Sequence, residues 1–233
     1  RWLLETPLNK DSLKKVIKDA EAYTGAGTGI IVRKHKEVAE YDSEKPSKDL
    51  VDAYDPKERY LSEECVSQLI TAAKLRLVET VERGDNRQVV SHQNALLCLG
   101  LLYYGCLRGG EVAKLNGMSF GFYSSQWKMN IEGKGMKQRL VAVTNELAEI
   151  IAFLHGISEY RAIPALAEIQ SIGSEPLLIN RRDRQLTYSG LYQAYKKMVN
   201  ELATEIDERW RLDVMKSSPH WMRHSGGTRL LRS

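Results

Sequence analysis

Tyr103-Tyr104-Gly105-Cys106-Leu107-Arg108-Gly109-Gly110-Glu111-Val112-Ala113-Lys114-Leu115 is the stretch around which this sequence is organised. It overlaps the end of an apolar run, residues 95–104, whose composition predicts a buried helix. Arg108 stands just beyond the glycine at which that run breaks. A guanidinium group taken out of water needs a fixed anionic partner, because an unpaired buried charge is strongly destabilising. The stretch therefore leaves two interpretations of Arg108 open: a structural salt bridge, for example to Glu111, and a charged functional group.

A second stretch, Glu132-Gly133-Lys134-Gly135-Met136-Lys137-Gln138-Arg139-Leu140-Val141, is a basic, glycine-rich turn between two predicted strands. By itself it predicts only a hairpin. It lacks the GxxxxGK[ST] spacing of a nucleotide-binding loop. The glycines on both sides of Lys134 would let this turn approach another backbone closely.

A third stretch, Ser218-Pro219-His220-Trp221-Met222-Arg223-His224-Ser225-Gly226-Gly227-Thr228-Arg229-Leu230-Leu231, lies near the end of the sequence. His220 and His224 are four residues apart, as zinc-binding histidines on one helix are. However, Trp221 occupies the position of the glutamate in the HExxH motif, and the sequence offers no evident third ligand. We therefore predict that this stretch binds no metal ion.

In this order and spacing, the three stretches resemble the catalytic domain of the tyrosine recombinases, the phage integrase family. The family's first box reads roughly Gly-Leu-Arg-x-x-Glu, and residues 106–111 read Cys-Leu-Arg-Gly-Gly-Glu. Its hairpin box, Gly-Lys-Gly-x-Lys-x-Arg, matches residues 133–139, and its third box, His-x-x-Arg-His, matches residues 220–224. The resemblance covers about residues 60 to 233. It implies an α+β, mainly α-helical fold, with packed helices and a small antiparallel sheet or hairpin on one side.

The resemblance also implies a function, site-specific DNA recombination through a 3′-phosphotyrosine intermediate. Arg108 and Arg223 would clamp the non-bridging phosphate oxygens, where negative charge grows in the transition state, because a planar guanidinium matches phosphate geometry. His220 would donate a further hydrogen bond or handle the proton of the nucleophile. Lys134 would protonate the leaving 5′ oxygen. No metal ion or other cofactor is needed, because the two guanidinium groups supply the positive charge.

The sequence departs from the family pattern in one important respect. The family's nucleophilic tyrosine follows the third box by one further helix and turn, whereas this sequence ends at Ser233. Tyr188, Tyr192 and Tyr195 precede the box, at positions of an amphipathic helix that packing explains. We therefore expect residues 60–233 to be a catalytic domain truncated at its C-terminus, which does not cleave DNA without the missing tyrosine.

Two other functions fit the same boxes. One is a non-catalytic DNA-binding protein that has kept the recombinase fold, and a tyrosine after a histidine or tryptophan in the tail would argue against it. The other is a type IB topoisomerase, which shares the arginine chemistry. A topoisomerase would relax supercoils as a monomer without sequence preference, whereas an integrase needs paired target sites.

Further basic residues are candidates for contacts with the DNA. By the same resemblance, the partner is double-stranded DNA, bound by a homo-oligomer that assembles as a tetrameric synapse. A charge cluster is usually only a solvated surface, but basic side chains near the boxes are suited to the phosphate backbone. The candidates are Lys137, Arg139, Arg181, Arg182 and Lys196.

The composition permits DNA binding without demanding it. The chain has 233 residues, a net charge of +4 and a pI of about 8.8, and the positive excess lies entirely beyond residue 59. Three cysteines without a CxxC pair favour reduced thiols and an intracellular protein. No apolar run reaches the roughly 18 residues of a membrane span, and no signal peptide is recognisable. We expect a cytoplasmic, nucleoid-associated prokaryotic protein with no membrane partner.

Local patterns predict the order of the elements. Residues 1–59 are expected to be the tail of an N-terminal DNA-binding domain and a linker, with a helix over 10–23. The domain over residues 60–233 is expected to open with a helix capped by Ser62, followed by a helix from a cap at Ser91 to Leu107. The other expected elements are strands over 120–124, 127–131 and 139–143, a helix capped by Thr144, a strand over 177–179, a helix capped by Thr187, and a last helix opened by Pro219 with Met222, Leu230 and Leu231 in the core.

Overall fold

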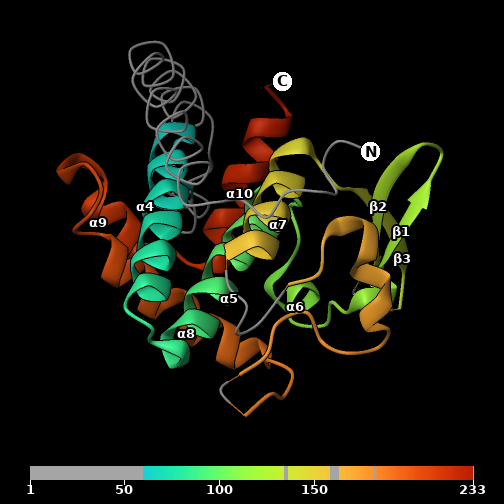
Figure 1. The fold of residues 1–233 in the computed structure, drawn as a ribbon. Helices are drawn as coiled ribbons and strands as arrows, with labels where there is room; N and C mark the ends of the chain where they lie inside the picture. The colour runs from blue at the N-terminus through green and yellow to red at the C-terminus, as the bar shows by residue number, and fades with distance from the viewer. Residues whose placement is uncertain (1–59, 134–135, 158–162, 181, 233) are drawn as a thin grey trace, which may run out of the picture.

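The computed structural model describes residues 60–133, 136–157, 163–180 and 182–232. Its helices and strands, shown in Figure 1, are α4 (Glu63–Glu82), α5 (Asn86–Tyr103), α6 (Gly109–Val112), η2 (Gly117–Ser119), β1 (Phe120–Tyr123), β2 (Gln126–Glu132), β3 (Gln138–Ala142), α7 (Asn145–Ile157), η3 (Leu166–Ile172), α8 (Tyr188–Leu202), α9 (Glu208–Lys216) and α10 (Pro219–Leu230). The predicted class, mainly α-helical with a small antiparallel sheet, is confirmed. The helix predicted over 10–23 and the linker after it fall in residues 1–59, outside the described residues.

Helix α5 is the centre of the core. Five of its leucines have no exposed surface: Leu96, Leu97, Leu99, Leu101 and Leu102. Helices α4, α7, α8 and α10 all pack against it. A helix that is apolar on every side is stable only when other elements surround it, which confirms the buried helix predicted from the run 95–104. The end of α5 thereby fixes where the chain turns toward Arg108.

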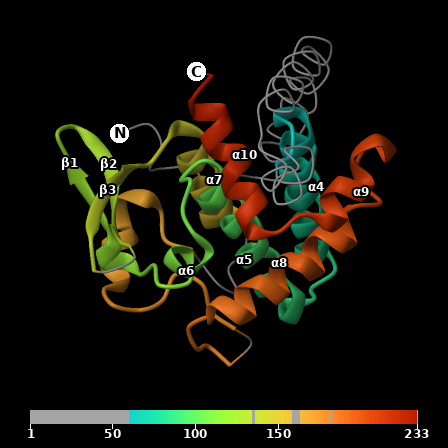
Figure 2. The same cartoon turned by 180° about the vertical axis from the view of Figure 1, so that it is seen from behind.

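The three strands form an antiparallel sheet at one side of the helices, in the order β1-β2-β3 (Figure 1). Phe120 pairs with Met129, and Met129 pairs with Val141. Phe120 and Met129 are buried, so this face of the sheet closes the core. Figure 2 shows α6 between the sheet and α10.

Short polar side chains begin the helices where the sequence predicts. The hydroxyl oxygens of Ser62, Thr144 and Thr187 each accept a hydrogen bond from a backbone N–H three residues ahead. The apolar face predicted for α8 is buried, namely Leu191, Tyr195, Met198, Val199 and Leu202. Helix α8 packs against α5 through this apolar face. The packing, together with the cap at Thr187, therefore fixes the position of Tyr188, the first residue of α8.

Several local predictions are wrong. Helix α5 is capped by Asp85 rather than Ser91, and it ends at Tyr103 because Cys106 has a φ of 49° in the left-handed region, which stops a helix. Segment 177–179 makes only an isolated pairing, Ile179 with Gln185, instead of a strand. Helix α9 was not predicted, since its nine residues bury only Val214.

The predicted core face of the last helix is only partly correct. Met222 is fully buried, but Leu230 is 50% exposed and Leu231 is 91% exposed. A helix turns about 100° per residue, so Leu231 lies on roughly the opposite side from Met222. The face that meets α5 is made instead by Met222, Ser225 and Gly226.

Two features dock α10 against the neighbouring helices α4, α5 and α7. Arg229 forms ion pairs with Glu63 and Glu146, and its guanidinium lies over the ring of Tyr104. Gly226 lies so close to α5 that a Cβ atom there would be 2.0 Å from the carbonyl oxygen of Tyr103. Because α10 carries His220 and Arg223, this contact sets the position of both side chains.

We predict that Gly226→Ala lowers the free energy of unfolding by about 2 kcal/mol, because the added methyl group forces the two helices apart. Gly227→Ala is the matched control, since a Cβ at Gly227 meets nothing within 4 Å. Alanine is favoured over glycine in a helix by up to about 1 kcal/mol, so the control should be neutral or stabilising. Urea unfolding of both variants measures the difference, and equal stabilities would contradict the close approach.

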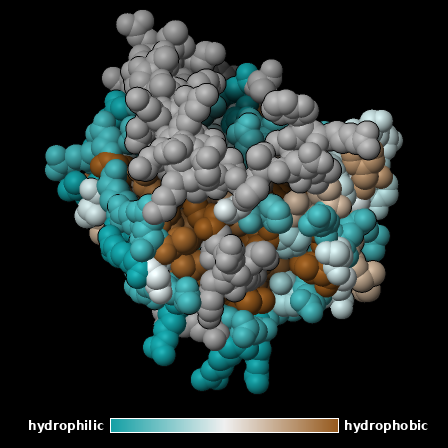
Figure 3. Space-filling model, viewed as in Figure 1, coloured by the Kyte–Doolittle hydropathy of each residue, from teal (hydrophilic) through white to brown (hydrophobic). Residues whose placement is uncertain are grey.

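On the face in Figure 3, hydrophilic side chains cover the edges, and an apolar area lies in the middle, near α7. Within the described ranges, no helix combines the length and the apolar character that crossing a bilayer requires.

Candidate active site

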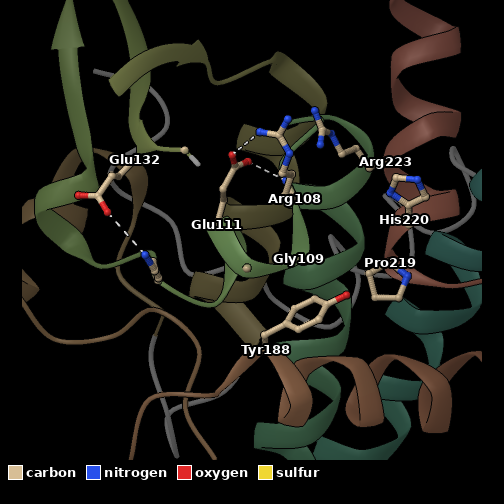
Figure 4. A pocket seen from close by; sticks show the side chains of 11 residues that line it. Arg108, Gly109, Glu111, Glu132, Tyr188, Pro219, His220 and Arg223 are labelled. Atoms are coloured by element: carbon tan, nitrogen blue, oxygen red, sulfur yellow. Dashed lines mark hydrogen bonds and ion pairs between the residues drawn. The ribbon is translucent and has the colours of Figure 1, made fainter. Parts of the chain in front are cut away.

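A pocket of about 430 Å³ opens where α6, the base of the β2–β3 hairpin and the first residues of α8 and α10 meet (Figure 4). Three of the predicted catalytic residues line it: Arg108, His220 and Arg223. Its other lining residues are Gly109, Gly110, Glu111, Lys114, Glu132, Gly133, Tyr188 and Pro219. Lys134 lies outside the described residues, next in the chain to Gly133.

Arg108 is the N-cap residue immediately before α6, with φ −72° and ψ 147°. Its side chain is 53% exposed, so the burial expected for it is not found, because α5 has already ended at Tyr103. Its Nη1 donates to Oε1 of Glu111 at 3.1 Å, and its backbone N–H donates to Oε2 at 2.7 Å. The salt bridge considered for Arg108 is therefore present, and the side chain still lines the pocket.

Glu111 is the carboxylate beneath this pocket, and its side chain is only 5% exposed. Arg139 donates to it twice, from Nη1 to Oε1 at 2.7 Å and from Nη2 to Oε2 at 2.8 Å. Burial raises the pKa of Glu111, but the hydrogen bonds from Arg139 and Arg108 outweigh burial and hold its pKa at about 2. Glu111 is therefore an anion at any physiological pH.

Arg223 enters the pocket from α10, and Figure 4 shows its guanidinium beside that of Arg108. Partial burial lowers the pKa of Arg223, and the positive charge of Arg108 lowers it further. Among the described residues, no carboxylate lies within ion-pair distance of Arg223. Glu111 binds two guanidinium groups, those of Arg108 and Arg139, and Arg223 adds a third positive charge beside them, so the excess of positive charge suits an anionic ligand.

His220 lies one turn before Arg223 on the same helix. Its Nε2 is 2.9 Å from Nε2 of His224, and the two rings are nearly perpendicular, at 88°. One of these nitrogens donates a hydrogen and the other accepts it, so each ring restricts the tautomer of the other. In the parts of the chain that the structure describes, no group of three His, Cys, Asp or Glu side chains could hold a metal ion.

The base of the hairpin is attached to the segment that follows α6. The N–H of Gly133 donates to the carbonyl oxygen of Lys137 at 2.8 Å, which closes the turn. Nζ of Lys114 lies 3.5 Å from Oε1 of Glu132. Lys134, the predicted general acid, follows Gly133, which itself lines the pocket.

The sequence profile of the phage integrase family matches residues 59–233. This chain belongs to the phage integrase family. Among solved structures, it is similar to the XerH site-specific recombinase, which was crystallised bound to a palindromic difH substrate as a post-cleavage complex. The identity is 17% and the TM-score 0.47, and the alignment covers 75% of this chain and 42% of the XerH chain. No curated protein matches the sequence.

Tyr188 lines the pocket of this phage integrase domain, which the helical pattern in the sequence did not predict. Packing was expected to explain Tyr188, Tyr192 and Tyr195, but it does so only for Tyr195, which is buried and hydrogen-bonded to Ser217. Tyr188 is 54% exposed because it occupies the first position of α8. Its ring lies against Gly109, where a Cβ would be 2.7 Å from Cε2, so this tyrosine needs glycine as its neighbour.

The basic residues predicted to bind DNA divide into two groups. Lys137, beside the hairpin turn, and Arg182, in the loop before α8, have exposed side chains. Arg181 lies outside the described residues. The exposed pair stays a prediction for the phosphate backbone, because solvated side chains are available to any anionic partner.

Arg139 and Lys196 have partners within the domain instead. Both terminal nitrogens of Arg139 bind Glu111. Nζ of Lys196 donates to the carbonyl oxygens of Met215 and Ser217, at 2.5 and 3.1 Å, and so closes the C-terminal end of α9. These contacts account for both side chains without DNA.

Proposed function

We propose that this chain is the DNA-cleaving domain of a tyrosine site-specific recombinase that acts on double-stranded DNA. The observation that carries the proposal is that Arg108, from α6, and Arg223, from α10, line one open pocket together with His220. Two adjacent cations repel each other, and an entering anion removes that repulsion. A phosphodiester has the charge and the two non-bridging oxygens that a pair of guanidinium groups can bind.

In the proposed reaction, a tyrosine oxygen attacks the phosphorus atom and the bond to the 5′ oxygen breaks. The product is a 3′-phosphotyrosine, and the reverse reaction with a new 5′ hydroxyl rejoins the strand. Arg108 and Arg223 hold the non-bridging oxygens, whose charge is greatest in the transition state. His220 binds the same phosphate or receives the tyrosine proton, and Lys134 gives a proton to the departing 5′ oxygen.

The proposal extends to the rest of the protein by family resemblance. The nucleophilic tyrosine is placed in a segment after the third box, and residues 1–59 are placed at the end of a DNA-binding domain that precedes the catalytic one. Lys137 and Arg182 would contact the phosphate backbone. The working assembly would be a homotetramer on paired sites, in a cytoplasm where the DNA is accessible.

The test uses protein expressed from the complete reading frame and a library of nicked duplexes. DNA that stays attached after denaturation in detergent is recovered and sequenced. We expect paired, inverted-repeat sequences joined through their 3′ phosphate. Arg83→Ala is a control that removes a surface charge paired with Glu79, far from the pocket residues in sequence, and it should capture as much DNA as the wild type.

Two outcomes would contradict the proposal. Tight binding with no covalent capture would indicate a DNA-binding protein that has lost catalysis. Capture at unrelated sequences, together with relaxation of supercoiled DNA by the monomer, would indicate a type IB topoisomerase.

A further inference from the structure

We infer that Arg139 is a positioning residue, which acts through Glu111 to keep the guanidinium group of Arg108 available to an anion in the pocket. A role of Arg139 in DNA cleavage rests on the proposed function. The effect of Arg139 on the Arg108 side chain does not depend on that function. The sequence suggested a direct DNA contact for Arg139. Both terminal nitrogens of Arg139 bind Glu111 instead, which supports a positioning role.

The two arginines share Glu111 unequally. Arg139 binds both carboxylate oxygens side-on, at 2.7 and 2.8 Å, whereas the guanidinium of Arg108 makes one longer contact of 3.1 Å to Oε1. A bidentate, charge-assisted pair is the stronger of these arrangements. Arg139 therefore neutralises most of the charge of Glu111, and Arg108 is held in place only weakly.

Loss of Arg139 would leave the buried carboxylate of Glu111 without its main partner. A buried carboxylate cannot remain unpaired at low cost, and Arg108 is the other guanidinium already bonded to it. Arg108 would then turn fully toward Glu111 and form the bidentate pair itself. The guanidinium group of Arg108 would then no longer be available to an anion in the pocket, although the residue is still present.

The same pair holds the hairpin. Arg139 lies on β3 opposite Ile131, and Glu111 lies on α6. A Cβ at Gly133 would lie 3.4 Å from Nη1 of Arg139 and 3.6 Å from Oε1 of Glu111, so the hairpin base rests directly on this pair. The position of Gly133 at the hairpin base and the freedom of Arg108 thus depend on one contact.

The first test measures the reactivity of Arg108 and needs no DNA. Phenylglyoxal must reach the guanidinium nitrogens, and a bidentate pair with a carboxylate occupies two of them, so capture by Glu111 should slow the reaction. In Arg139→Met, we expect the modification of Arg108, followed by peptide mass spectrometry, to slow by about tenfold. In Arg139→Met/Glu111→Gln, the neutral amide cannot capture Arg108, and reactivity should return to the wild-type rate or above it.

The second test follows the single-turnover rate of covalent adduct formation on the captured target at saturating DNA, under conditions where urea unfolding shows each variant to be folded. Arg139→Met should be slower by about a hundredfold, the usual effect of a misplaced catalytic group. The double variant should form the adduct at least about tenfold faster than Arg139→Met. A merely structural role of Arg139 would not produce this recovery.

The outcomes separate the two proposals. Unchanged reactivity of Arg108 in Arg139→Met, or equal loss in the single and double variants, would overturn the role of Arg139. If reactivity follows the expected pattern while the wild type forms no adduct with any duplex, the positioning role stands and the proposed recombinase function falls.

Discussion

Arg108→Ala and Arg223→Ala are each expected to lower the single-turnover rate of DNA cleavage by about 10² to 10³-fold, the usual effect of removing one preorganised donor from a developing negative charge. Both guanidinium groups line the pocket, and neither arginine belongs to the buried core. Their loss should therefore change the rate far more than the stability. Quantification of adducts on denaturing gels, with protein in excess over DNA, measures the effect.

Conservative variants sharpen this prediction. Arg108→Lys and Arg223→Lys keep the charge but lose the planar fork that binds two oxygens at once, so they should recover only part of the rate. The two sites act on the same phosphate, and the double alanine variant should be less impaired than the product of the single losses. Wild-type adduct levels in either alanine variant would mean that the pocket does not hold the scissile phosphate.

The meeting of Arg108, His220 and Arg223 could be predicted because each residue belongs to a motif with a fixed place in the chain. A buried helix precedes Arg108, and a proline-started helix carries the other two. These local signals set where the helices begin, and the apolar faces set how they pack. The prediction that the three side chains share one pocket came from the family resemblance of the boxes rather than from these local signals, and Lys134, the fourth predicted catalytic residue, lies outside the described residues.

The partner of Glu111 could not be predicted in the same way. Its nearest arginine in the sequence is Arg108, three residues away, and the sequence pointed only to that pair. The stronger partner, Arg139, is 28 residues away on another element, and only the packing of β3 beside α6 brings it there. Tertiary structure decides which of the two arginines binds Glu111 more strongly, and a local sequence pattern carries no information on that choice.

Tyr188 and Leu231 illustrate a second limit. Helical spacing assigns a residue to one face of a helix, but it does not show how far along the helix neighbouring elements bury that face. Tyr188 is the first residue of α8 and faces the pocket, and Leu231 lies just beyond α10, largely in solvent. Predictions from periodicity therefore fail at helix ends, and of these two residues Tyr188 lines the pocket.

Glu111→Gln is expected to lower the free energy of unfolding by about 3 kcal/mol near pH 7, and the difference from the wild type should disappear in acid. The pKa of Glu111 falls from an ordinary 4.5 to about 2 in the folded protein. A carboxyl group whose pKa is lower in the folded state stabilises the fold above its unfolded pKa. That contribution is complete above about pH 4.5 and is lost progressively as the pH falls toward about 2.

Urea unfolding of the wild type and Glu111→Gln at a series of pH values between neutrality and acid measures this difference directly. Glu79→Gln is the matched control, because Glu79 pairs with Arg83 on an exposed helix surface, where such a pair contributes at most about 1 kcal/mol. The control should differ little from the wild type at any pH. A difference for Glu111→Gln that stays constant down to acid pH would mean that the shape of the side chain, rather than its charge between Arg108 and Arg139, stabilises the site. The positive charge of the pocket would then be balanced by a group other than Glu111, and the role inferred for Arg139 would lose its physical basis.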